Sequence, residues 1–100
     1  MFNLNNIPDI EHKTVDIENQ FFENYPEFLH LREKIEEVII NMANEWKNER
    51  PRTKFYGILY WVMKKENSNL TQVQFAKKYN IYRSSLTRIT RNYGFILKNI

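Results

Sequence analysis

The chain has 100 residues, of which 42% are hydrophobic and 27% are charged, with a formal net charge of +3 and no cysteine. This composition is typical of one globular domain with a modest core, and the lack of cysteine excludes disulfides and thiolate metal sites. No apolar run approaches the roughly 20 residues of a membrane helix, and no basic start with a following apolar block marks a signal peptide. We therefore expect a cytoplasmic protein with no membrane partner.

The two halves of the sequence carry opposite charge. Residues 1–49 contain four basic and eleven acidic side chains, a net charge of −7, whereas residues 50–100 contain eleven basic and one acidic side chain, a net charge of +10. This asymmetry predicts that the second half meets a polyanion such as nucleic acid and that the first half does not. The alternative is that the two halves only neutralise each other within the fold.

The sequence of the first half predicts a flexible arm followed by two helices. Residues 1–13 contain three asparagines, a proline and little periodicity, which is typical of a flexible arm. A short helix is predicted from Thr14, acting as its N-cap, to about Asn24. The longest helix is predicted from Glu27 to about Asn48, because apolar residues recur at spacings of three and four. Its apolar stripe consists of Phe28, Leu31, Ile35, Val38, Ile39, Met42 and Trp46.

A central helix is predicted from Pro51 to about Lys65, because proline suits the first helical position. It is apolar nearly all round, which is typical of a helix buried in the middle of a bundle. Gly57 lowers its helical stability and is expected to permit a close approach by another helix. The residues expected to point inward are Phe55, Ile58, Leu59 and Val62.

Residues 70–94 have the features of a helix-turn-helix. Thr71 is a natural N-cap, and Gln74, three residues later, can complete a capping box. Val73 and Ala76 lie near one face of the first helix, and Phe75 and Tyr79, four residues apart, lie on an adjoining stripe. The small side chain of Ala76 matters because two helices that cross steeply must bring their backbones close together. This spacing matches the DNA-binding motif whose second helix enters the major groove.

The turn and the second helix of this motif are also marked in the sequence. Asn80 is predicted to end the first helix, because asparagine tolerates the left-handed conformation that a tight turn needs. The second helix is predicted from Arg83 to Tyr93, with Gly94 ending it in a left-handed conformation. Its inward residues are expected to be Leu86 and Ile89. The apolar residues after Gly94 are expected to fold back on the core or to cover a partner.

The outward face of the second helix carries arginines and hydroxyl groups. Its members are Arg83, Ser84, Thr87, Arg88 and Arg91. Arginine can hydrogen-bond guanine edges or phosphates, and hydroxyl groups can contact bases or phosphates. No acidic residue occurs between Ala76 and the last residue, and a face without mixed signs favours a polyanionic partner. The alternative is an ordinary helical hairpin in a small bundle.

From about Leu31 to Gly94 the order of these features resembles one cyclin-like repeat of archaeal transcription factor B and its eukaryotic counterpart. The matching pieces are Glu33–Trp46, then Pro51-Arg52-Thr53 leading into Tyr56–Met63, and then Thr71-Gln72 through Arg91. The resemblance implies a cyclin-like helical fold whose last helix reads a promoter element in the major groove. It implies DNA contacts at Gln72, Arg83, Ser84, Thr87, Arg88 and Arg91.

The chain also departs from that family. Its central helix is rich in aromatic residues, where the family has alanine, and it has room for one repeat and no cysteine for the family's zinc ribbon. We therefore expect a stand-alone regulator in place of a complete initiation factor.

Nothing in the sequence favours an enzyme. His12 and His30 are the only histidines. Glu11-His12 has no further ligands nearby and Glu27 with His30 is a single pair at helical spacing, whereas a metal site needs three or four ligands. Gly57 and Gly94 are the only glycines, which excludes a glycine-rich phosphate loop. The acidic pairs are expected on a helix face, without the apolar surroundings that raise a pKa. We expect no enzymatic activity, no cofactor and no metal ion.

The sequence therefore predicts an all-α protein, a bundle of four to five helices over residues 14–100 with a C-terminal helix-turn-helix. The predicted function is sequence-specific binding of double-stranded DNA as a transcription regulator, with the helix at about 83–93 in the major groove. A homodimer, through residues 27–48 or through the apolar tail after Gly94, would enlarge the DNA site. The alternatives are a cyclin-like protein-interaction module and a nucleic-acid binder without sequence preference.

Overall fold

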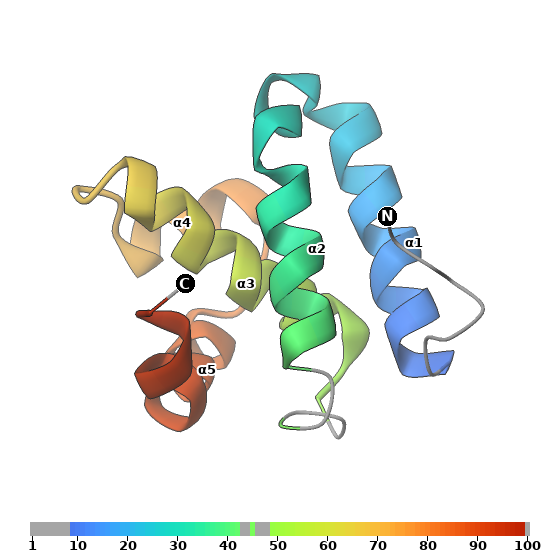
Figure 1. Ribbon diagram of the computed structural model, residues 1–100. Helices are drawn as coiled ribbons and strands as arrows, with labels where there is room; N and C mark the ends of the chain where they lie inside the picture. Colours follow the sequence, from blue (N-terminus) through green and yellow to red (C-terminus); the bar gives the residue numbers. More distant parts are fainter. Residues whose placement is uncertain (1–8, 43–44, 46–48, 100) are drawn as a thin grey trace. The chain divides into compact units, whose positions relative to one another are not determined.

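The computed structural model (Figure 1) describes residues 9–42, 45 and 49–99. The regular structure of these residues is entirely helical, which confirms the all-α class and the number of α-helices. The elements are α1 (Asp9–Asn24), the 3-10 helix η2 (Pro26–Leu31), α2 (Arg32–Asn41), α3 (Pro51–Glu66), α4 (Gln72–Tyr79) and α5 (Arg83–Leu97). None of the helices so described is long and apolar enough to cross a membrane.

The chain divides into two compact units, the first reaching to Phe55 and the second beginning at Tyr56. Helix α3 therefore contributes its start to the first unit and most of its length to the second. The single domain predicted over residues 14–100 stays a prediction. The flexible arm stays one for residues 1–8, which lie outside the described part of the chain.

Helix α1 begins earlier than the sequence predicted. It starts at Asp9, and Thr14, the predicted N-cap, is buried inside the helix. The predicted start at Thr14 was wrong because residues 9–13 contain neither proline nor glycine, so nothing in them stops the helix from extending upstream. The end of α1 at Asn24 agrees with the prediction.

The predicted helix over residues 27–48 is not one continuous α-helix. Its first residues form the 3-10 helix η2, in which the Phe28 amide donates to the Tyr25 carbonyl oxygen at 3.1 Å. This tighter winding is accompanied by ring stacking. The ring centroid of Phe21 lies 4.9 Å from that of Tyr25 and 6.2 Å from that of Phe28. The α-helical part ends at Asn41, and the Met42 amide donates to the Val38 carbonyl oxygen.

The apolar stripe of this region is buried as predicted from Leu31 to Met42. Its buried members are Leu31, Ile35, Val38, Ile39 and Met42, and Phe28 is half-buried. Trp46, the last predicted member, lies outside the described residues, as do residues 43–44 and 47–48. Burial of this stripe leaves the acidic side chains of α2 on its other face.

Helix α3 agrees closely with its prediction. It begins at Pro51 and ends at Glu66, and the four residues predicted to point inward are all buried. In the second unit, the ring centroid of Phe75 in α4 lies 5.3 Å from that of Tyr60 in α3 and 4.8 Å from that of Tyr79. Gly57 permits the predicted close approach, because a Cβ atom there would lie 3.0 Å from Ile89 Cγ2 of α5.

The end of α5 differs from the prediction. Gly94 does not have a positive φ and does not stop the helix, which continues to Leu97. Gly94 is buried, and a Cβ atom there would lie 3.7 Å from the Trp61 ring. The extra turn buries Leu97 completely, which stabilises the helix by more than the roughly 1 kcal/mol that an internal glycine costs. Phe95, in contrast, is 64% exposed.

Candidate nucleic-acid interface

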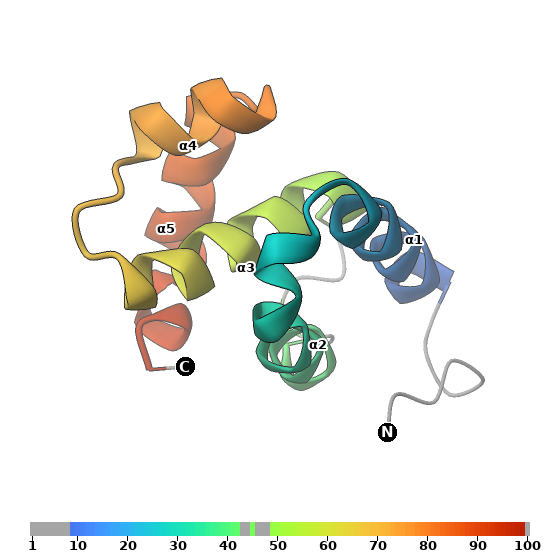
Figure 2. The ribbon, with the colours of Figure 1, turned by 90° about the horizontal axis from the view of Figure 1, so that it is seen from above.

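Helices α4 and α5 lie against each other and are joined by a short turn (Figure 2). The predicted capping box is present at the start of α4. The Thr71 hydroxyl accepts from the Gln74 amide at 3.1 Å, and the Gln74 side-chain oxygen accepts from the Thr71 amide at 3.0 Å. Two of the amides that a helix start leaves without partners are thereby satisfied, so the position at which α4 begins is well defined.

The turn between the two helices has the predicted left-handed residue. Asn80 has φ 54° and ψ 53°, and it is the one non-glycine residue in the described chain with a positive φ. The amides of Asn80 and Ile81 both donate to the Ala76 carbonyl oxygen, which satisfies the last turn of α4. Ala76 itself is buried, as predicted, whereas Val73 is half-exposed and does not belong to the inward face. Phe75 takes that place because it reaches the aromatic side chains of α3.

Helix α5 is oriented as the sequence predicted. Leu86 and Ile89 are 2% and 1% exposed, so they hold the inward face of the helix. The five predicted outward residues are all exposed: Arg83, Ser84, Thr87, Arg88 and Arg91. Because the helix runs on to Leu97, the same outward face also carries Phe95 and Lys98, four and seven residues beyond Arg91. We call the outward residues from Arg83 to Lys98 the α5 face.

Gln72, the sixth predicted site residue, differs from the other five because its side chain is half-buried and bonded within the protein. The Thr87 hydroxyl lies 3.0 Å from Gln72 Oε1, and Gln72 Nε2 lies 3.5 Å from the Thr90 hydroxyl oxygen. Gln72 therefore joins the first turn of α4 to the middle of α5. Its side chain supports the α5 face in addition to lying beside it.

The charge of the second unit is strongly one-sided. Its only acidic residue is Glu66, against eight lysines and arginines. Among them, Lys64 Nζ donates to the Leu70 carbonyl oxygen at 3.0 Å, and Lys65 Nζ donates to the Lys98 carbonyl oxygen at 2.8 Å. The other six are exposed, five of them on α4 and α5 and the sixth, Lys98, directly after α5. Together they give a positive potential around the turn and the α5 face.

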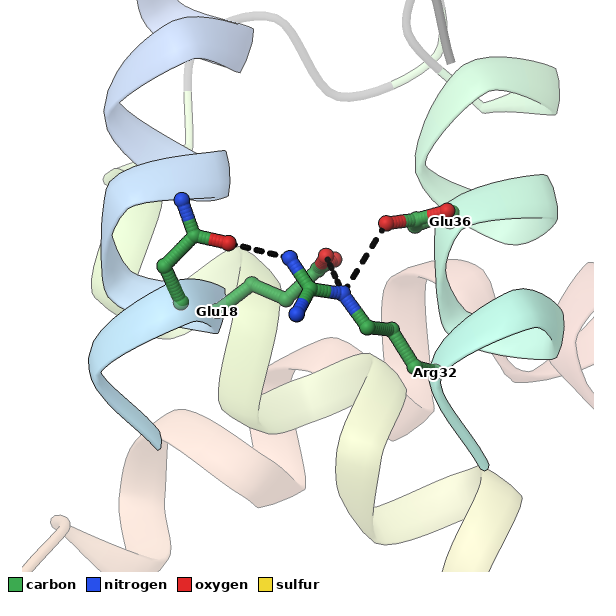
Figure 3. A network of polar contacts seen from close by, with 4 residues as sticks. Glu18, Arg32 and Glu36 are labelled. Atoms are coloured by element: carbon green, nitrogen blue, oxygen red, sulfur yellow. Dashed lines mark hydrogen bonds and ion pairs between the residues drawn. The ribbon is translucent and has the colours of Figure 1, made fainter. Parts of the chain in front are cut away.

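The first unit contains a buried acidic group that the sequence reasoning missed (Figure 3). Glu18 is completely buried on α1, and Arg32 Nε of α2 donates to its Oε2 at 3.0 Å and to Glu36 Oε1 at 3.2 Å. Arg32 also donates to Asn19 Oδ1. The second oxygen of Glu18 is buried without a hydrogen-bond partner among the described residues.

The surroundings of Glu18 disfavour its ionised form. Burial raises the pKa of Glu18 from 4.5 to about 8, with a further increase from the neighbouring Glu36, while Arg32 acts in the opposite direction. The burial of Glu18 was not predicted, because the expectation from the sequence concerned only the acidic pairs on a helix face. A signal was present, because Val15, Glu18 and Phe22 follow each other at spacings of three and four along the buried side of α1.

Ligands for a metal ion are not brought together in the described part of the chain, where no three His, Cys, Asp or Glu side chains form a suitable group. His30 is exposed on η2, and the side chain of His12 lies outside what the structure describes.

Protein-family models, curated protein sequences and solved structures gave no match to this chain. The resemblance to a cyclin-like repeat of transcription factor B therefore stays an expectation from the sequence.

Proposed function

We propose that the chain is a sequence-specific DNA-binding protein, a transcription regulator, in which α4 and α5 act as a helix-turn-helix. The observation that carries the proposal is the α5 face, where exposed arginines and hydroxyl groups occur without any acidic side chain. Arginine and hydroxyl groups are the donors and acceptors that read base edges and hold phosphates. The residues assigned to DNA are Gln72, Arg83, Ser84, Thr87, Arg88 and Arg91.

The dimensions of α5 suit the major groove of B-form DNA. A helix with its side chains is about 10–12 Å across, and the groove is about 12 Å wide. The Asn80 turn and the buried Leu86 and Ile89 hold α5 by its inward side, so its outward side can enter the groove. The helix is fixed before binding, and little conformational entropy is then lost on forming the complex.

The first test is selection from a randomised pool of duplex DNA at near-physiological salt. A sharply enriched sequence would support the proposal, and its symmetry would report whether the chain binds as a monomer or as a homodimer. The apolar residues after Gly94 are one place for a dimer contact, and residues 27–48 are the other. Binding without enrichment would indicate a charge-driven nucleic-acid binder, whose affinity follows salt but not sequence.

Arg88→Ala is expected to weaken binding to the enriched sequence by about 1–3 kcal/mol and to relax the base preference at one position, because the arginine lies in the middle of the α5 face. Titration of the enriched duplex and its single-base variants measures both effects. Lys77→Ala is the matched control, since it removes one exposed positive charge from α4 and should weaken all sequences slightly and equally. Uniform weakening by Arg88→Ala as well would assign Arg88 to a phosphate contact.

A protein-interaction module is the second candidate, and one observation on the first unit favours it. Ile40 is 50% exposed on α2, on the face that also carries the exposed Glu33 and Glu37. An apolar side chain among carboxylates suits a basic, partly apolar protein surface. Failure to bind any duplex even at low salt would favour this candidate, and Ile40→Asp would then be expected to abolish the protein contact.

A further inference from the structure

The Thr87 hydroxyl lies on the α5 face and has two acceptors within the protein. Its Oγ1 is 3.0 Å from Gln72 Oε1 and 3.2 Å from the carbonyl oxygen of Arg83. A threonine hydroxyl has one hydrogen to donate and two lone pairs that accept. Whichever oxygen receives the hydrogen, it is held inside the protein, and the exposed side of the hydroxyl is left with lone pairs.

This result does not depend on the orientation of the Gln72 amide, whose oxygen and nitrogen can exchange places by rotation. With the nitrogen toward Thr87, the amide would donate to the hydroxyl oxygen, and the hydroxyl would donate to the Arg83 carbonyl oxygen. One lone pair of Thr87 would still remain for a ligand. In both orientations Thr87 offers an acceptor and no donor.

Resting on the proposed DNA-reading role of α5, we propose that Thr87 is a specificity-determining acceptor that selects adenine or cytosine over guanine or thymine at one position of the strand it faces. In the major groove adenine N6 and cytosine N4 donate, whereas thymine O4 and guanine O6 accept. A hydroxyl that acts only as an acceptor can form a hydrogen bond with these amino groups. It leaves the keto oxygens of thymine and guanine without a donor. Phosphate oxygens are also acceptors, so the same geometry directs Thr87 to a base.

The test compares the full-length chain with three variants in selection from the randomised duplex pool, followed by titration of the enriched site and its single-base variants. Thr87→Val removes the hydroxyl at nearly constant volume, and Thr87→Ser keeps it. Ser85→Ala is the matched control, because it removes a hydroxyl from the same helix at a half-buried position outside the α5 face. Thr87→Ala, with its higher helix propensity, removes the hydroxyl a second time in case valine weakens the helix.

We expect the unmodified chain to prefer adenine or cytosine at one position by about five- to tenfold, the value of one hydrogen bond to a base edge. Thr87→Val and Thr87→Ala should lose that preference and change no other position of the enriched sequence, whereas Thr87→Ser and Ser85→Ala should retain the preference. An enriched sequence that is the same for Thr87→Val, or a Thr87-dependent preference for guanine or thymine, would overturn the inference and leave the proposed function standing. No enriched sequence for the unmodified chain would overturn both.

Discussion

Truncation of Leu86 to alanine is expected to lower the free energy of unfolding by about 2–5 kcal/mol, which is the range for a large buried side chain cut back to a methyl group. Leu86 is 2% exposed on the inward side of α5. Its truncation creates no new polar contact that could offset the lost burial. Urea unfolding followed by circular dichroism would measure the loss. DNA affinity at temperatures where the variant is still folded would show whether the α5 face survives.

Ser84→Ala is the control for this experiment. Ser84 lies two residues earlier on the same helix and is exposed, so its truncation should change stability by no more than about 0.5 kcal/mol. A Leu86→Ala loss as small as this would contradict the orientation of α5 and, with it, the assignment of the α5 face.

Glu18 is expected to make the protein less stable as the pH rises from 4.5 towards about 8, the interval between its ordinary and its folded pKa. In that interval the folded protein keeps a proton on Glu18 that the unfolded chain has released. Unfolding therefore releases a proton, and the free energy of unfolding falls by up to about 1.4 kcal/mol per pH unit. The stabilising contribution is complete below the lower pKa and is lost as the pH rises through the upper one.

Glu18→Gln is expected to remove this dependence, because glutamine is a neutral side chain of nearly the same shape. Thermal unfolding at several pH values between the two pKa values would show a flatter profile for the variant and a higher stability than the unmodified protein at the alkaline end. Glu37→Gln removes a carboxylate that is largely exposed on α2 and should leave the profile unchanged. A Glu18→Gln profile parallel to that of the unmodified protein would mean that Glu18 is ionised in the fold.

The predictions that succeeded concern features determined within a few residues. The capping box of Thr71 and Gln74, the left-handed Asn80 and the start of α3 at Pro51 each follow from the chemistry of one or two side chains acting on their own backbone. The inward placement of Leu86 also follows locally, because helical periodicity alone determines which side of α5 is apolar.

The predictions that failed include features that depend on packing as well as on the local sequence. Glycine often ends a helix, but α5 continues beyond Gly94 because the additional turn buries Leu97. The residues after Pro26 have an α-helical pattern, but stacking on the Phe21 ring accompanies a 3-10 helix. Glutamate is usually exposed, but Glu18 is buried because it lies on the inward side of α1 and accepts a hydrogen bond from the Arg32 guanidinium.

The close approach of α3 and α5 has a consequence for how this sequence can change in evolution. Gly57 and Ile89 share one small volume, since any side chain at position 57 would begin 3.0 Å from Ile89 Cγ2. A larger residue at position 57 becomes acceptable only with a smaller one at position 89, so homologous sequences should show these two positions varying together. Residue 89 lies on the back of the helix that carries the α5 face. A lineage that enlarged position 57 without reducing position 89 would push α5 away from α3, and so move its arginines without mutating them.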